Sequence, residues 1–210
     1  MRVSDPFGAA DFAAAADVSR ETLARLEIYA ALLATWNKRM NLVAASTLKD
    51  LWRRHMLDSA QLHRYIPKES RVLVDFGSGA GFPGLVLAIM GVPDVHLVES
   101  NQRKCAFLRE VARVTHTHVT IHCGRAESLT PWPADVVTAR ALSSLSLLLE
   151  YAEPFLTPKT VCLFPKGRGV KEELMETQKT WKIAFDMLYS MTDTQGTILR
   201  LEAISRDRAC

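Results

Sequence analysis

The stretch from Val72 to Gly84, VLVDFGSGAGFPG, decides the fold of this chain. The apolar run before Asp75 is typical of a strand that is buried on both faces. The glycines that follow let the backbone approach a ligand at positions where a Cβ would collide. Pro83 and the apolar residues after it predict a helix that packs back on the sheet. The sequence therefore predicts the first half of a βαβ unit.

The glycines of this turn fit two cofactor families. Gly79-x-Gly81-x-x-Gly84 satisfies the dinucleotide fingerprint, in which a pyrophosphate sits on a helix N-terminus. Asp75-x-Gly77-x-Gly79-x-Gly81 instead satisfies the loop that binds S-adenosylmethionine. An acidic residue at this place would repel a pyrophosphate but suits the ammonium group of a methionine moiety. The loop therefore favours S-adenosylmethionine, and a dinucleotide or a purely structural turn stays open.

The next expected strand, residues 95–99, ends in Glu99. A carboxylate at this place can accept hydrogen bonds from both hydroxyl groups of a ribose, and both cofactor families use it. Glu99 therefore indicates an adenosine-containing ligand without deciding which one.

The order of elements after residue 71 separates the two families. Strands and helices alternate, which predicts a parallel sheet with right-handed crossovers. The expected strands are 71–76, 95–99, 119–123, 135–139 and 160–165, and the expected helices are 82–90, 102–114, 143–155 and 170–181. The last segments, 183–191 and 197–204, predict an antiparallel hairpin. This finish is typical of the Class I S-adenosylmethionine-dependent methyltransferase fold, an α/β, Rossmann-like, mostly parallel seven-stranded sheet.

The first seventy residues show helical periodicity and no strand signal, so we expect an N-terminal helical cap over 1–70 and a methyltransferase domain over 71–210. One amphipathic helix is expected over 20–37, with Ser19 as its N-cap. A second is expected over 47–65 and leaves four polar residues for the outer surface or a cleft: Arg53, Arg54, Asp58 and Gln61.

Length and composition narrow the function classes further. A chain of 210 residues has no room for the second domain of a two-domain oxidoreductase. A net charge of +3 permits nucleic-acid binding without requiring it. The four cysteines show no metal-ligand spacing and are expected to be reduced core thiols, and we expect no metal. No signal peptide or membrane span is evident, so we expect a cytoplasmic protein.

Ligands of an open α/β sheet bind beyond the carboxyl ends of the strands, which directs attention to the residues after each strand. After the third strand, the Ala126 amide and the Glu127 carboxylate could hold an adenine ring. The fourth strand ends at Arg140 and the fifth at Lys166. No Asn/Asp-Pro-Pro-Tyr or Pro-Cys motif is present, which disfavours methylation of an exocyclic amine or of pyrimidine carbon five. The acceptor is therefore expected to be already nucleophilic, as guanine N7 is, or a hydroxyl group activated by lysine.

Several motifs together resemble one family. They are Trp36-Asn37-Lys38-x-x-Asn41-Leu42, Arg54-His55-x-Leu57-Asp58-Ser59, the glycine loop with Phe82-Pro83-Gly84, Arg140-Ala141 and Lys166-Gly167. In this combination the chain resembles the bacterial 16S ribosomal RNA guanine-N7 methyltransferases, also called glucose-inhibited division protein B. The resemblance implies methyl transfer from S-adenosylmethionine to guanine N7 in the 530 loop of 16S ribosomal RNA. It carries cofactor contact onto Gly77, Phe82, Glu99, Ala126, Glu127 and Arg140.

Five residues are then candidates for holding the guanine edge and nearby phosphates: Asn41, Arg54, His55, Arg140 and Lys166. His55 could instead be a satisfied, half-buried helix residue. We expect a monomer that acts on 16S ribosomal RNA, the 30S subunit or an assembly intermediate, without a membrane. Two alternatives stay open, a dinucleotide-dependent oxidoreductase and a non-catalytic ribosome-assembly factor.

Overall fold

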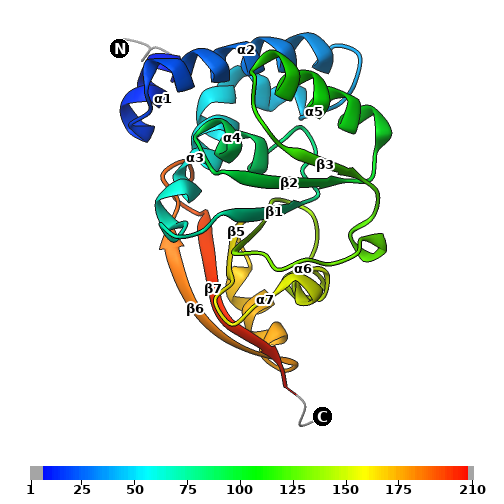
Figure 1. Cartoon of the computed structure of the whole chain (residues 1–210). Helices are drawn as coiled ribbons and strands as arrows, with labels where there is room; N and C mark the ends of the chain where they lie inside the picture. The colour runs from blue at the N-terminus through cyan, green and yellow to red at the C-terminus, as the bar shows by residue number, and fades with distance from the viewer. Residues whose placement is uncertain (1–6, 208–210) are drawn as a thin grey trace.

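A seven-stranded sheet forms the centre of the computed structural model, which describes residues 7–207 (Figure 1). The strand order is β3-β2-β1-β4-β5-β7-β6. Neighbouring strands from β3 to β5 are parallel, and β7 is antiparallel to both β5 and β6. The strands are β1 Val72–Phe76, β2 Asp94–Glu99, β3 Thr120–Cys123, β4 Val136–Ala139, β5 Val161–Lys166, β6 Trp181–Tyr189 and β7 Thr197–Arg206. The predicted parallel sheet with an antiparallel finish is confirmed.

Helices cover both faces of this sheet (Figure 1). They are α1 Ala9–Ala16, α2 Arg20–Asn37, α3 Asp58–Ala60, α4 Gly84–Ile89, α5 Gln102–Val114, α6 Leu145–Ala152 and α7 Val170–Thr177. Leu73 joins a hydrophobic cluster with α2, α4 and α5, whereas its neighbour Val74 joins a second cluster with α6 and α7. Successive side chains of a strand point to opposite faces, so β1 is apolar throughout because both of its faces are buried.

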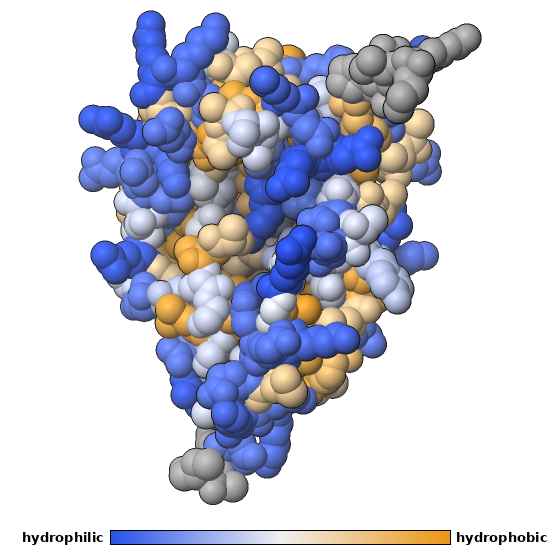
Figure 2. Space-filling model, turned by 180° about the vertical axis from the view of Figure 1, so that it is seen from behind, coloured by the Kyte–Doolittle hydropathy of each residue, from blue (hydrophilic) through white to orange (hydrophobic). Residues whose placement is uncertain are grey.

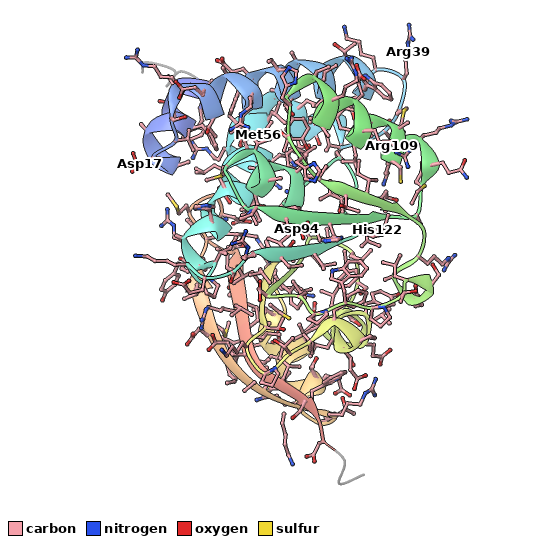
Figure 3. All side chains as sticks on the ribbon, in the orientation of Figure 1. Asp17, Arg39, Met56, Asp94, Arg109 and His122 are labelled. Atoms are coloured by element: carbon pink, nitrogen blue, oxygen red, sulfur yellow. The ribbon has the colours of Figure 1, made fainter. Side chains whose placement is uncertain are left out.

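The N-terminal helices share the first of these clusters with the sheet. Leu26, Tyr29 and Met56 are fully buried in it beside residues of α4 and α5. Figure 3 shows Met56 inside the molecule, between the N-terminal helices and the sheet, whereas Arg39 lies at the outer end of α2. The segment before the glycine turn is therefore held against the sheet by apolar contacts.

The segment expected as one helix over 47–65 is irregular. It consists of a 3₁₀ turn at Ala45–Asp50, a π turn at Trp52–Leu57, the short α3 and a second 3₁₀ turn at Gln61–Tyr65. The Ser59 hydroxyl donates to the His55 carbonyl, a type of bond that bends helices. π turns occur often at functional sites. Apolar periodicity predicted the helical character of the segment but not these changes of pitch.

The boundary between α7 and β6 also differs from the expectation. The helix ends at Thr177 rather than 181, and Trp181 begins the strand opposite Arg206. Trp181 is almost fully buried in the second hydrophobic cluster. Tertiary burial of this large side chain therefore outweighs the helical pattern of the residues before it. Within the expected N-terminal helical cap, Ala9–Ala16 form α1.

Figure 2 shows hydrophilic side chains over most of the rear face, with apolar residues in small separate patches. Among residues 7–207, no helix has the length and apolar character needed to cross a membrane. Cys105 and Cys162 are buried free thiols, as expected, but Cys123 is exposed because it ends the edge strand β3. Cys210 lies outside the described residues.

Candidate active site

The turn after β1 has a backbone shape that glycine favours. Gly77 has a φ of +67° and Gly79 a φ of +58°. A Cβ on Gly77 would lie 2.6 Å from Leu142 Cδ1, and the amides of Gly77 and Ser78 donate to the Val98 carbonyl of β2. The positive φ values and the close approach together explain why glycine is needed here.

Asp75 stabilises this turn by accepting hydrogen bonds in the interior of the protein. Its carboxylate is fully buried, with Oδ1 accepting from the Thr138 hydroxyl at 2.8 Å and Oδ2 from the Gly84 amide at 3.2 Å. Burial raises the pKa of Asp75 to about 6, although these hydrogen bonds and Arg140 act in the opposite direction. Asp75 is not among the residues that line the cavities described below, so its expected contact with a cofactor ammonium stays a prediction.

Replacing Asp75 by asparagine should remove a pH dependence of stability and keep one carbonyl oxygen that can accept from the Gly84 amide. The folded-state pKa of about 6 lies above that of an unfolded aspartate. The stabilising contribution of the carboxyl group is therefore fully present below about pH 4 and is lost as the pH rises to about 6. We expect the unfolding free energy of the wild type, relative to Asp75→Asn, to fall by about 2–3 kcal/mol over this range. Urea unfolding of both proteins across pH measures this, and a pH-independent difference would contradict it.

A first cavity, the Glu99 cavity, lies beyond the ends of β1 and β2 and has a volume of about 420 Å³. Glu99 is buried, and its two oxygens accept from the amides of Gly79 at 2.9 Å and Asn101 at 2.7 Å. Residues of the loop after β3, Ala126 and Glu127, line the same cavity. The predicted nucleoside contacts thus lie around one space. A carboxylate that accepts from hydroxyl groups, beside a backbone loop, fits a ribose and an adenine.

Two further cavities continue from the first. The glycine-loop cavity, about 360 Å³, is lined by Gly77, Gly79, Phe82 and Arg140 among others, and it shares Gly77, Lys104 and Ala141 with the Glu99 cavity. The hairpin cavity, about 350 Å³, lies beyond β4 and β5 and reaches the turn between β6 and β7. The last two cavities share Thr47, His55, Arg140 and Ala141. The three spaces therefore form a row along the carboxyl edge of the sheet.

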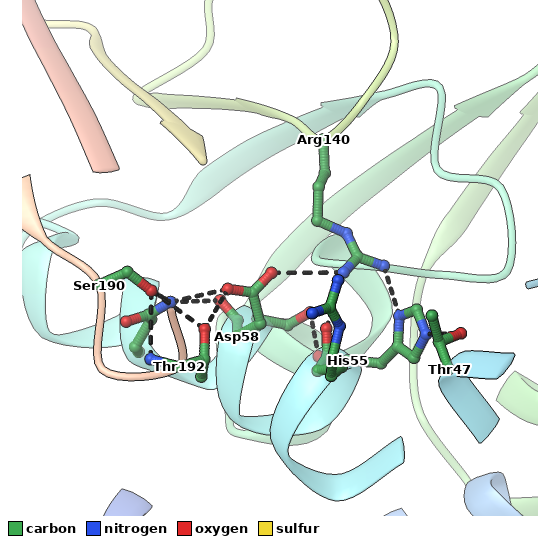
Figure 4. A network of polar contacts seen from close by, with 9 residues as sticks. Thr47, His55, Asp58, Arg140, Ser190 and Thr192 are labelled. Atoms are coloured by element: carbon green, nitrogen blue, oxygen red, sulfur yellow. Dashed lines mark hydrogen bonds and ion pairs between the residues drawn. The ribbon is translucent and has the colours of Figure 1, made fainter. Parts of the chain in front are cut away.

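Arg140 lies at the point where the last two cavities meet (Figure 4). Its guanidinium donates to the Arg54 carbonyl at 3.2 Å, to Asp58 Oδ2 at 3.3 Å and to His55 Nδ1 at 3.0 Å. It also lies over the Phe82 ring, 5.1 Å from the ring centre. A planar group with several fixed donors suits this position, because it holds three partners at once.

His55 has both ring nitrogens engaged. Nδ1 must accept from Arg140, which only donates, so Nε2 carries the proton and donates to Thr47 Oγ1 at 2.8 Å. Burial, with Arg140 and Arg54 nearby, lowers the pKa of His55 to about 4. The ring also stacks on Phe82. The imidazole is therefore neutral at physiological pH and positions its neighbours.

Asp58 connects the N-terminal segment to the C-terminal hairpin (Figure 4). Its Oδ1 accepts from Thr192 Oγ1 at 2.7 Å and from Gln61 Nε2 at 3.0 Å. Gln61 in turn accepts from the Met191 amide at 2.8 Å. The bonds to Thr192 and Met191 join segments more than 120 residues apart. The sequence placed Asp58 and Gln61 on the outer surface or in a cleft and gave no indication of these partners.

The remaining candidates lie in different surroundings. Lys166 lines the hairpin cavity and is paired with Glu173 at 2.7 Å. Arg54 is exposed and lines the same cavity. Asn41 is exposed and is not among the residues that line the three cavities. Its neighbour Asn37, quoted only as part of a motif, shapes the loop beside it by bonding to the backbone of Leu42 and Val43.

The fold is that of the Class I methyltransferases. Two solved structures share the fold. One is the M. jannaschii TYW2 in complex with AdoMet, with a TM-score of 0.54, 17% identity and coverage of 70% of this chain and 74% of that one. The other is the ribosomal protein L11 methylase of Lactobacillus delbrueckii subsp. bulgaricus, with a TM-score of 0.56, 14% identity and coverage of 71% and 77%.

Residues 22–200 match the family described as GidB, rRNA small subunit methyltransferase G, and the chain belongs to this family. A ribosomal RNA small subunit methyltransferase G of Rhodospirillum centenum is 57% identical over 199 residues, which cover 95% of this chain and 92% of that protein. The protein of the same name from Paramagnetospirillum magneticum is 58% identical over 192 residues, which cover 91% and 94%. The oxidoreductase and non-catalytic alternatives gain no support from these relatives.

Proposed function

We propose that this protein transfers the methyl group of S-adenosylmethionine to N7 of a guanine in 16S ribosomal RNA. The observation that carries the proposal is the row of three cavities, with a buried carboxylate at one end and Arg140, Arg54 and Lys166 around the other. Membership of the rRNA small subunit methyltransferase G family supports the substrate class.

The Glu99 cavity would hold the nucleoside part of the cofactor. Glu99 would accept hydrogen bonds from the ribose hydroxyls, and the loop with Ala126 and Glu127 would contact the adenine. The glycine turn and Phe82 line the adjoining cavity and would hold the methionine part. When bound, S-adenosylmethionine supplies an electrophilic methyl group.

The hairpin cavity would hold the guanine and the phosphates beside it. Arg54, Arg140 and Lys166 offer donors to phosphate oxygens and to guanine O6. Guanine N7 carries a lone pair and no proton, so transfer to N7 requires orientation and electrostatic stabilisation but no general base. The engaged, neutral His55 agrees with this requirement, because neither of its nitrogens is free to take a proton.

The rate of methyl transfer should be nearly independent of pH around neutrality. His55, with a pKa of about 4, does not titrate in this range. Provided that chemistry limits the rate, we expect a single-turnover rate that varies less than about twofold between roughly pH 6.5 and 8.5. His55→Gln should show the same flat profile at a reduced rate. A tenfold rise per pH unit that disappears in His55→Gln would show that a base is required.

Transfer of a tritiated methyl group tests the proposed function. The substrates are naked 16S ribosomal RNA, 30S subunits and assembly intermediates from a strain that lacks the gene. We expect label in guanine, located as 7-methylguanine by aniline-induced strand cleavage. Binding of particles without transfer of label would indicate an assembly factor, and binding of NAD in preference to S-adenosylhomocysteine would indicate an oxidoreductase.

A further inference from the structure

The ion pair between Lys166 and Glu173 has unused hydrogen-bonding capacity inside the hairpin cavity. Lys166 has three N–H donors, and two of them go to Glu173 Oε2 at 2.7 Å and the Ser143 carbonyl at 3.2 Å. Glu173 Oε2 also accepts from the Leu145 amide at 3.0 Å. Within residues 7–207, Glu173 Oε1 takes part in none of the hydrogen bonds. One lysine donor and one carboxylate oxygen therefore remain side by side.

The pair is held in place by three different elements. Lys166 ends β5 with only 11% of its side chain exposed, Glu173 lies in the first turn of α7, and Leu145 begins α6. Both residues of the pair line the hairpin cavity. Because β5, α6 and α7 belong to the same hydrophobic cluster, the remaining donor and acceptor have a fixed place relative to the sheet.

Guanine presents the complementary pattern on its Watson–Crick edge. Its O6 accepts, and the neighbouring N1–H and N2 amino group donate, whereas adenine presents a donor followed by an acceptor. Enzymes that act on single bases commonly read this edge by hydrogen bonds. A lysine beside a carboxylate thus matches guanine and mismatches adenine at both atoms.

We propose that Lys166 and Glu173 select the acceptor guanine, with Lys166 donating to O6 and Glu173 Oε1 accepting from N1–H and the N2 amino group. The proposal rests on the proposed function and names its specificity-determining residues. Contact at the Watson–Crick edge leaves N7 free on the other edge of the base, and the hairpin cavity adjoins the glycine-loop cavity through His55 and Arg140.

Asp58, which lines the hairpin cavity and pairs with Arg140, is a poorer candidate for this contact. Asp58 Oδ1 already accepts from Thr192 and Gln61, and its Oδ2 accepts from Arg140. Both of its oxygens are therefore used to join segments of the protein. Glu173 differs because one oxygen keeps the pair in place and the other has no partner among the described residues.

A substrate with one functional group removed tests the proposal. Inosine lacks only the N2 amino group of guanosine, and it can be placed at the acceptor position of 16S ribosomal RNA by ligation. The measurement is single-turnover methyl transfer to guanosine and inosine substrates by the wild type, Glu173→Gln and Glu172→Gln. Glu172 is the exposed neighbour of Glu173 in α7 and serves as the matched control.

We expect the wild type and Glu172→Gln to prefer guanosine over inosine by about 10–100-fold, the loss expected for one hydrogen bond to a charged group. In Glu173→Gln the amide oxygen is needed by Lys166 and Leu145, so the amide nitrogen would face the base and the preference should fall to about threefold or less. Slower transfer to both substrates with an unchanged preference would mean a purely structural role and would overturn the proposal. So would equal rates on both substrates with the wild type.

Two controls distinguish a loss of guanosine selectivity from misfolding of the variant and from failure of the proposed function. Unchanged affinity for S-adenosylhomocysteine in Glu173→Gln shows that the variant is folded and that the cofactor site is intact. Failure of the wild type to methylate guanosine would refute the proposed function itself, whereas loss of selectivity only at another residue would refute the assignment to Glu173.

Discussion

Replacing Glu99 by alanine is expected to weaken the binding of S-adenosylhomocysteine by about 100-fold or more. Two hydrogen bonds from ribose hydroxyls to a carboxylate are worth roughly 1.5–3 kcal/mol each, and about 1.4 kcal/mol corresponds to tenfold in affinity. The same substitution removes the acceptors of the Gly79 and Asn101 amides, so the glycine turn loses its support as well. Isothermal titration calorimetry measures the loss directly.

Two further variants separate the ribose contact from the support of the turn. Glu99→Gln keeps the shape of the side chain but offers only one acceptor oxygen, so its affinity should lie between those of the wild type and Glu99→Ala. Glu127→Ala removes an exposed carboxylate of the same cavity that bonds no backbone amide of the glycine turn. An affinity of Glu99→Ala equal to that of the wild type would remove Glu99 from the cofactor site.

The sheet and the places of the residues around the Glu99 cavity could be predicted because their signals are local. β1 reads as an apolar run because it is buried on both faces, and the glycines follow it directly. Glu99 ends β2 and the loop with Ala126 follows β3, and the carboxyl ends of neighbouring parallel strands meet at one edge. Each residue could therefore be placed without knowing any long-range side-chain contact.

The residues around the hairpin cavity could be predicted only in part, because their contacts join distant segments. The sequence indicated His55, Arg140 and Lys166 by motif, but it could not show that Thr192 bonds to Asp58 or that Glu173 pairs with Lys166. These pairings depend on how the β6–β7 turn and α7 pack against the rest of the fold. Such packing leaves no periodic pattern in the sequence. From the sequence alone, an acidic residue such as Glu173 in the first turn of a helix indicates only a favourable helix N-terminus.

Replacing Arg140 by alanine is expected to reduce the rate of methyl transfer by about 100–1000-fold, which corresponds to roughly 3–4 kcal/mol. The substitution leaves Asp58 without its cation and the Arg54 carbonyl and His55 Nδ1 without their donor. Removing one partner of a largely buried ion pair costs more than the pair contributes, because the remaining charge stays poorly solvated. Single-turnover transfer to 16S ribosomal RNA measures the rate, and thermal unfolding shows whether the variant is folded.

Arg140→Lys distinguishes the shape of the guanidinium from its charge. A lysine can neutralise Asp58, but a single ammonium group cannot also reach His55 and the Arg54 carbonyl in the planar arrangement seen here. We therefore expect it to recover about tenfold of the activity lost in Arg140→Ala and not the remainder. Arg206→Lys is the matched control. Arg206 Nε donates to both carboxylate oxygens of Glu153 at the far end of β7, so this variant should retain wild-type activity. Full activity of Arg140→Lys would mean that charge alone is needed, and the role of Arg140 in holding three partners would then be wrong.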